Sequence, residues 1–212
     1  MLGRKMTRVP LYWKENFFSV FNNEKATAAL TAFISLKGNV ADFYYLNKMM
    51  YLLERKSILE TGMPVFFDRL CSLPYGPVPS NVNDELKNVR QMWDFADWAP
   101  YVRFNGQTTV ELIQEADYDY LSRYELRSIQ QLHKEIEDTL HLSKREPNDA
   151  FNTLHSYVMK LPEYVKKDAG SEYLPYEDLL IKNGVDPIRA QKIQDEIDFQ
   201  TLLTIGIKAD AA

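Results

Sequence analysis

The chain has 212 residues, of which 45% are hydrophobic and 26% charged, a balance typical of a globular protein that buries a substantial core. Its formal net charge of -5 argues against nucleic acid as the partner of the surface as a whole. No apolar run approaches the roughly 20 residues of a membrane span, and no apolar signal stretch begins the chain. We therefore expect a cytoplasmic protein without membrane contact. The one cysteine, Cys71, excludes an intramolecular disulfide and is expected to be buried.

Residues 1–20 are predicted to form an amphipathic lead-in. Four basic side chains gather there: Arg4, Lys5, Arg8 and Lys14. Such an arm could contact phosphates in DNA-binding autorepression, but so few charges would give only weak, salt-sensitive binding. A solvated chain terminus is the simpler interpretation.

Two helices are predicted next. The first begins at Asn22–Asn23, where a short polar side chain can cap free backbone N–H groups, and ends at residues 37–39 around Gly38. The second follows at once from Phe43, carries apolar side chains around most of its surface and ends at Gly62. A helix of this composition is expected at the centre of the core.

The residue pattern changes after Gly62. Residues 63–68 are predicted to be a short extended segment, with Pro64 at a strand start or edge. Residues 73–79 read Leu-Pro-Tyr-Gly-Pro-Val-Pro and are expected to be irregular, because three prolines remove backbone donors. Ser80 or Asn81 is expected to cap a helix that runs to about Gln91.

Residues 99–113 predict a β-hairpin around Asn105-Gly106, whose strands are expected to join residues 63–68 in a small sheet. Ser122 and Glu125 form a capping-box pattern that opens another helix. Further helices are predicted at about 147–160, 175–183 and 187–203, the last with Asp186 as its cap and Pro187 in its first turn. The predicted fold class is α+β, mainly α: a compact helical domain with a small antiparallel β element.

Catalytic patterns are missing from the sequence. His133, His141 and His155 lack metal-ligand spacing, and neither a serine-nucleophile elbow nor a glycine-rich phosphate loop occurs. Residues 117–120, Asp-Tyr-Asp-Tyr, are interpreted as a polar loop before a capped helix rather than as paired catalytic carboxylates. We expect no catalytic residue, no cofactor and no metal.

The strongest constellation is the segment 73–79. A stiff turn that exposes Tyr75 and Val78 loses little entropy on docking, which suits a recognition edge. A rigid connection in which Tyr75 is merely packed explains the same residues equally well.

The order of these segments resembles the Panacea domain, also called SocA-like. The resemblance covers about residues 21–180 and is carried by the helix start at 21–26, by Leu-Asn-Lys-Met-Met-Tyr-Leu-Leu at 46–53, by Gly62, by Leu-Pro-Tyr-Gly-Pro-Val-Pro-Ser at 73–80 and by residues 121–126. Residues 63–68 show a milder form of the family's usual pattern, and the residues after 180 lie beyond it.

The resemblance implies an antitoxin of a bacterial or phage toxin–antitoxin pair, which neutralises a cognate protein toxin, encoded by the adjacent gene, by direct binding and occlusion. Its expected domains are a lead-in at 1–20, the Panacea domain at 21–183 and a helical extension at 184–212. The sequence leaves open whether the protein forms a homo-oligomer. The partner-binding residues are predicted to be Tyr51, Tyr75, Gly76, Pro77, Val78 and Pro79.

One alternative function that the resemblance implies is a proteolytic adaptor that delivers its bound partner to a cytoplasmic protease. Ala211-Ala212 resembles the small apolar tails that bacterial unfoldases read, although two alanines also make an inert end.

Overall fold

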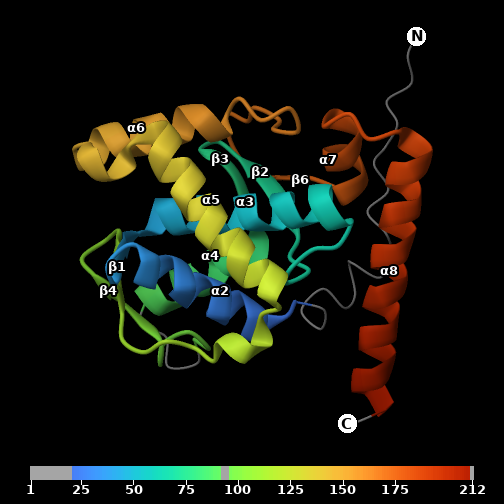
Figure 1. Ribbon diagram of the computed structural model, residues 1–212, viewed down its shortest axis with the longest axis horizontal. Helices are drawn as coiled ribbons and strands as arrows, with labels where there is room; N and C mark the ends of the chain where they lie inside the picture. The colour runs from blue at the N-terminus through green and yellow to red at the C-terminus, as the bar shows by residue number, and fades with distance from the viewer. Residues whose placement is uncertain (1–20, 92–95, 211–212) are drawn as a thin grey trace.

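A computed structural model describes residues 21–91 and 96–210, with side chains described to residue 204. It confirms the predicted class, a mainly helical α+β protein (Figure 1). In chain order the elements are α2 (Asn23–Leu36), β1 (Val40–Asp42), α3 (Phe43–Thr61), β2 (Leu70–Leu73), β3 (Gly76–Pro79), α4 (Ser80–Arg90), β4 (Val102–Asn105), β5 (Thr109–Leu112), η2 (Tyr118–Tyr120), α5 (Arg123–Leu140), η3 (Leu142–Lys144), α6 (Pro147–Val158), β6 (Glu172–Tyr173), α7 (Tyr176–Lys182) and α8 (Pro187–Asp210).

Helix α3 lies at the centre of the core, as its composition predicts. It contacts α2, α4, α5, α6, α7 and strand β3, and it is buried almost continuously from Tyr45 to Leu53. The Asp42 carboxylate caps its first turn, and Gly62 ends it in the left-handed conformation, with a φ of 78°. The predicted cap of α2 is also confirmed, since the Asn22 side chain accepts a hydrogen bond from the N–H of Lys25 at 2.9 Å.

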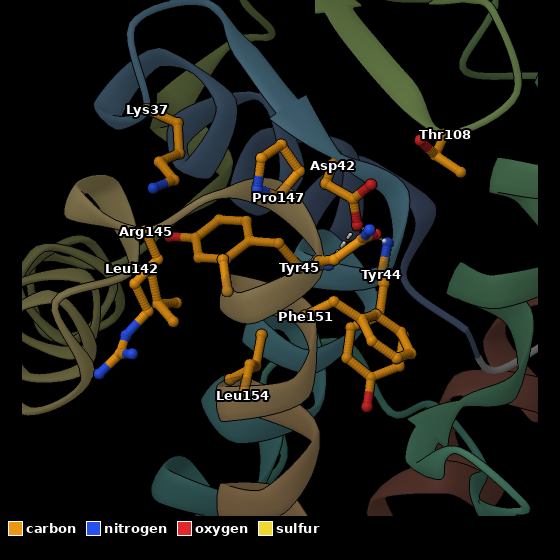
Figure 2. A pocket seen from close by; sticks show the side chains of 12 residues that line it. Lys37, Asp42, Tyr44, Tyr45, Thr108, Leu142, Arg145, Pro147, Phe151 and Leu154 are labelled. Atoms are coloured by element: carbon orange, nitrogen blue, oxygen red, sulfur yellow. Dashed lines mark hydrogen bonds between the residues drawn. The ribbon is translucent and has the colours of Figure 1, made fainter.

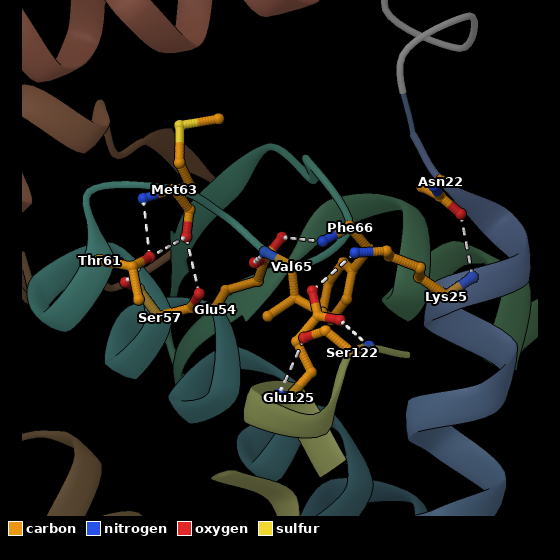
Figure 3. Close-up of polar contacts among 10 residues, drawn as sticks. All are labelled: Asn22, Lys25, Glu54, Ser57, Thr61, Met63, Val65, Phe66, Ser122 and Glu125. Atoms are coloured by element: carbon orange, nitrogen blue, oxygen red, sulfur yellow. Dashed lines mark hydrogen bonds and ion pairs between the residues drawn. The ribbon is translucent and has the colours of Figure 1, made fainter. Parts of the chain in front are cut away.

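The start of α5 has the predicted capping box. Ser122 accepts from the N–H of Glu125, and the Glu125 carboxylate accepts from the N–H of Ser122 (Figure 3). The same carboxylate forms a 2.7 Å ion pair with Lys25, so the cap of α5 also ties this helix to α2.

The predicted β-hairpin is confirmed as β4 and β5, but two details were wrong. Asn105 is the last residue of β4 and pairs with Thr109, so only Gly106 takes a positive φ in the three-residue loop. The third strand of this sheet is β1, not residues 63–68, and the order is β1-β5-β4. Asn39 has a φ of 70° just before β1, so the chain turns sharply out of α2 and runs antiparallel to β5.

Residues 63–68 form no strand because Glu54 takes their backbone donors. The Glu54 side chain on α3 has no exposed surface. It accepts hydrogen bonds from the N–H groups of Val65, Phe66 and Asp68, and Figure 3 shows Val65 and Phe66 beside it. Phe67 between them has a φ of 56°, an unfavourable conformation for a bulky residue, which breaks the extended path. Burial raises the pKa of Glu54 to about 8, against the opposing effect of these hydrogen bonds.

The expectation that residues 73–79 are irregular was wrong. β2 and β3 form a hairpin with Pro74 and Tyr75 as its two-residue turn, and the sheet order is β3-β2-β6. The carbonyl of Leu70 accepts from Leu174, so Leu70 and, two residues on, Ser72 direct their backbone groups toward β6. Their β3 partners, Pro79 and Pro77, therefore need no N–H, and the prolines fit this edge strand.

Neither Ser80 nor Asn81 caps α4, which corrects the predicted cap. The cap comes instead from Asp68, whose two oxygens accept from the N–H groups of Asn81 and Val82 at 2.9 and 3.0 Å. Asp68 has no exposed surface, and burial raises its pKa to about 7. A remote carboxylate serves a helix start as well as a local one because only the position of its oxygens matters.

The predicted helices after residue 146 are confirmed as α6, α7 and α8. Asp186 caps α8 as predicted, accepting from Ile188 and Arg189, but the helix continues to Asp210 rather than ending near 203. It packs on α7 and stands along one side of the molecule (red in Figure 1), and Ile193 lies against Gly62. No helix within the described ranges is long and apolar enough to cross a membrane. The predictions for residues 1–20 and for Ala211-Ala212 lie outside the described residues.

Candidate partner-binding surface

The structure separates the six predicted partner-binding residues. Tyr75 is 65% exposed at the tip of the β2–β3 hairpin, whereas Gly76, Pro77, Val78 and Pro79 in β3 are buried beneath it. The predicted exposure of Tyr51 to a partner is wrong. Its side chain has no exposed surface, and its hydroxyl donates to Glu163 at 2.8 Å. The role of Tyr51 is in the core, because a buried anchor cannot touch a partner.

Side-chain donors from two other segments hold the hairpin turn. Tyr44 on α3 donates to the carbonyl of Tyr75 at 2.8 Å, and Lys48, one helical turn further on, donates to that of Pro77 at 2.8 Å. From the opposite side, Tyr164 donates to the carbonyl of Leu73 at 3.0 Å. The turn is therefore fixed before any partner binds, which lowers the entropy that docking would cost.

His155 on α6 completes this arrangement. Its Nδ1 lies 3.1 Å from the hydroxyl of Tyr44, and that hydroxyl gives its only proton to the carbonyl of Tyr75. Because that proton is already used, Nδ1 is assigned as the donor in the His155–Tyr44 contact. Burial raises the pKa of Tyr44 well above its usual value, so Tyr44 keeps this proton.

An aromatic surface results, which we call the Tyr75 surface: the rings of Tyr75, Phe151 and His155, with Tyr44 beneath them. The rings of Phe151 and His155 are stacked with an interplanar angle of 4°, and the ring of Tyr75 lies 6.5 and 6.1 Å from them, respectively, between centroids. Phe151 is 37% exposed, and its ring lies 4.4 Å from that of Tyr44. Rings at these separations and tilts stabilise each other beyond their buried area.

A pocket of about 360 Å³ adjoins the Tyr75 surface, and Tyr44 and Phe151 belong to both (Figure 2). Apolar side chains form much of its wall: Tyr45 from α3, Leu142 from η3, and Pro147, Ala150 and Leu154 from α6. Lys37 and Arg145 contribute cations, but Lys37 pairs with Glu137 at 2.6 Å and Arg145 with Asp149 at 2.7 Å. The pocket thus presents an apolar wall with a polar rim of Lys37, Arg145 and Asp42, and the apolar wall suits an apolar side chain.

The underside of the hairpin is tightly packed. Gly76 has a φ of 96°, and a Cβ at this position would lie 2.9 Å from Cγ2 of Val158 and 3.3 Å from Nζ of Lys48. Both the backbone conformation and the space therefore require glycine here. This packing joins β3 to α3 and α6, so the three elements that build the Tyr75 surface form one unit.

The other residues that the sequence singled out as chemical candidates have structural roles. His133 contacts the hydroxyl of Tyr45 at 2.8 Å, and burial lowers its pKa. His141 is the left-handed C-cap of α5, and Asp117 accepts from the N–H of Asp119 at the start of η2. Among the described residues, no group of three or more His, Cys, Asp or Glu side chains is placed to hold a metal ion.

Sequence reasoning missed Tyr44, Lys48 and Phe151 as parts of this surface. The spacing offers one signal: Tyr44 and Lys48 are four residues apart on α3, and so are Phe151 and His155 on α6, so each pair shares a helix face. Nothing in this spacing shows that the two faces meet at the hairpin, because α3 and α6 are more than 80 residues apart in the chain.

Helix α8 carries a second exposed apolar face. Phe199, Leu202 and Leu203 are each at least 45% exposed and follow the spacing of one helix face. The Tyr75 surface, which adjoins a pocket and is held by donors from α3, is the better defined of the two.

The fold is mainly helical α+β, and it carries an exposed aromatic surface on a fixed hairpin. Residues 46–146 match the family model described as antitoxin SocA-like, Panacea domain, which confirms the resemblance over this stretch. The match begins within α3, includes the whole β2–β3 hairpin and ends one residue before α6. Comparison with curated proteins and with solved structures gave no match.

Proposed function

We propose that this chain is an antitoxin that neutralises a cognate protein toxin by binding it directly with the Tyr75 surface. The observation that carries the proposal is the position of Tyr75, 65% exposed on a fixed hairpin inside the stretch that matches the antitoxin family model. A large exposed aromatic side chain on a rigid turn is the kind of residue that dominates protein–protein binding energy.

The surroundings of Tyr75 favour a protein partner over a small ligand. Tyr75 and Phe151 offer exposed apolar area, and the neighbouring pocket can take one side chain of the partner. An exposed anchor beside a pocket suits an irregular protein surface, which both inserts a side chain and receives one. Occlusion follows if the partner contacts this surface with residues that surround its active site.

The division of the Tyr75 surface suggests how one scaffold serves a particular toxin. The hairpin lies within the family match, whereas Phe151 and His155 on α6 lie outside it. We propose that α6 adapts the surface to its partner. The domain boundaries at 21–183 and 184–212, and a toxin gene next to this one, remain part of the proposal.

Growth and co-purification with the product of the neighbouring gene test this function. We expect that product to arrest growth alone, and to be harmless in a stable complex with this chain. Tyr75→Ala should weaken the complex by about 30-fold, about 2 kcal/mol, as for a binding hot spot. Its free energy of unfolding should change by less than about 0.5 kcal/mol, because the side chain is mostly exposed.

Tyr120→Ala is the matched control. Tyr120 is 51% exposed and lines a different hollow together with Asn23 and Asp97, so its removal should leave binding unchanged. A harmless neighbouring product, or the lack of a complex, would contradict the antitoxin function. A complex that Tyr75→Ala does not weaken would keep the function and move the interface elsewhere, with the α8 face to be tested next.

A further inference from the structure

Lys48 is an unusual residue for the centre of a core. It is 1% exposed, although lysine is rarely buried completely, and its Nζ donates a hydrogen bond to the carbonyl of Pro77. Its Nζ also lies 4.7 Å from the centre of the Tyr44 ring. Within residues 21–91 and 96–204, no carboxylate forms an ion pair with it, so a charge on Lys48 would be buried without a counter-ion.

The location of Lys48 points to the hairpin. Nζ touches the position where a Gly76 side chain would stand, and its hydrogen bond holds the residue two positions after Tyr75. Tyr44, on the same face of α3, holds the carbonyl of Tyr75 itself. An apolar side chain of similar length would fill this site without the cost of burying an amine, so the amine is best explained by what it holds.

We propose that Lys48 is a proton-sensitive positioning residue of the Tyr75 surface: its neutral amine holds the hairpin in the closed position, and uptake of a proton favours opening of the hairpin. A neutral amine still donates the hydrogen bond to Pro77, whereas an ammonium gains by reaching water. Opening of the hairpin is the movement that would bring water to Nζ, because β3 is the sheet edge that covers it.

The direction of the effect follows from linkage. Burial lowers the pKa of Lys48 to about 7, whereas the same group exposed in the open hairpin has its ordinary value of 10.5. Between these two values the open form binds a proton that the closed form lacks. Lowering the pH from 10.5 toward 7 therefore favours opening, by about tenfold per pH unit, and below 7 the effect levels off.

Other ionisable groups stand on the elements around Lys48. They include Asp42, Tyr44, Tyr51 and Glu54 on or before α3, Cys71 in β2, His155 on α6, and Glu163 and Tyr164 in the segment after α6. Glu163 is engaged by Arg55 at 2.7 Å, and burial raises the pKa of Tyr44 and Tyr51 far above neutrality. Burial also raises the pKa of Glu54 to about 8 and that of the Cys71 thiol, so the contribution of Lys48 is taken from the comparison of the wild type with Lys48→Met, which keeps both groups.

The test uses the protein alone, so it does not depend on the proposed function. Amide hydrogen exchange of the paired residues Cys71 and Val78, corrected for the intrinsic rate, reports hairpin opening between pH 7 and 9. We expect the opening constant of the wild type to fall by about tenfold per pH unit. In Lys48→Met this tenfold fall should be lost. Lys56→Met, a half-buried lysine on the same helix that pairs with Glu60, should behave as the wild type.

An NMR titration of the Lys48 Cε in the wild type covers the case in which Lys48→Met does not fold. A midpoint near 7, accompanied by shifts of the Tyr75 ring, supports the proposal. A midpoint above 10, or an opening constant that ignores pH, overturns it. The consequence for toxin binding rests on the proposed function: affinity should rise from pH 7 to pH 8.5 in the wild type and stay constant in Lys48→Met. If Tyr75→Ala does not weaken binding and the affinity of the wild type does not change with pH, the proposed interface is refuted and the exchange result still stands.

Discussion

The two β-hairpins of this protein are built by different means. In β4–β5, Gly106 turns the chain at a φ of 81°, and a Cβ there would meet no atom within 4 Å. In β2–β3, Gly76 turns the chain at a φ of 96° against Val158, and side chains from α3 and from Tyr164 hold the turn. The first turn forms from its own residues, whereas the second depends on the remainder of the fold.

The β2–β3 turn is stable because residues outside the hairpin hold it. A turn that is held from outside transmits changes in its supports to the residue it presents, here Tyr75. A free turn such as that at Gly106 absorbs changes locally. The supports of β2–β3 should therefore influence both stability and binding, and those of β4–β5 stability alone.

The largest effect is expected at Glu54, which fixes the segment leading into β2. Glu54→Gln replaces an acceptor oxygen by an NH₂ group that faces backbone N–H groups, so at least one buried donor loses its partner. We expect the free energy of unfolding to fall by about 3 kcal/mol at pH 5, measured by urea denaturation. Glu60→Gln, exposed on the same helix, is the control and should cost under about 0.5 kcal/mol.

The deficit of Glu54→Gln should also depend on pH. The pKa of Glu54 is about 8 in the folded state and 4.5 when exposed, so the folded state keeps a proton that the unfolded state has released between these values. The stabilisation from Glu54 is therefore complete below pH 4.5 and declines as the pH rises to 8. The difference between wild type and Glu54→Gln should narrow over this range, and a constant difference would contradict a neutral buried carboxyl.

A smaller loss of stability is expected when either turn glycine is replaced by alanine. Comparing the two variants tests directly whether the two turns are held differently. Gly106→Ala incurs only the cost of a positive φ, about 1 kcal/mol of unfolding free energy. Gly76→Ala adds a collision with Val158 and should cost about 2 kcal/mol. Equal losses in thermal or urea unfolding would mean that the β2–β3 turn is as independent as β4–β5.

The smallest effect is expected at Tyr164. Tyr164→Phe removes the hydroxyl that donates to the Leu73 carbonyl and should reduce the free energy of unfolding by about 1 kcal/mol. Exchange of the hairpin amides should rise, while that of the β4–β5 amides stays unchanged. Tyr124→Phe, which loses an exposed contact with Glu60, is the matched control. Faster exchange in both hairpins would point to a general loss of stability instead.

Local signals in the sequence were sufficient for much of the fold. The cap at Asn22, the stop at Gly62, the capping box at Ser122 and Glu125 and the cap at Asp186 were all predicted and confirmed. Each of these is an interaction between residues at most four apart, so neighbouring residue types determine it. The β4–β5 hairpin belongs to the same class, since a glycine at a short loop suffices to reverse the chain.

The errors concern interactions between distant residues. Asp68 caps α4 from twelve or more positions away, and β1 rather than residues 63–68 completes the first sheet. The prolines of β3 become compatible with a strand only because β2 directs alternate residues toward β6. No local pattern contains this information.

For the candidate site, residue types along the chain determined that Tyr75 lies in a stiff Pro-Tyr-Gly-Pro turn within a stretch that resembles the Panacea domain. Only the tertiary structure decided that Tyr75 is exposed while Tyr51 is buried, and that Phe151 and Lys48 meet the hairpin. The physical reason is that backbone conformation depends on neighbouring residues, whereas exposure and side-chain contact depend on which remote segments pack together.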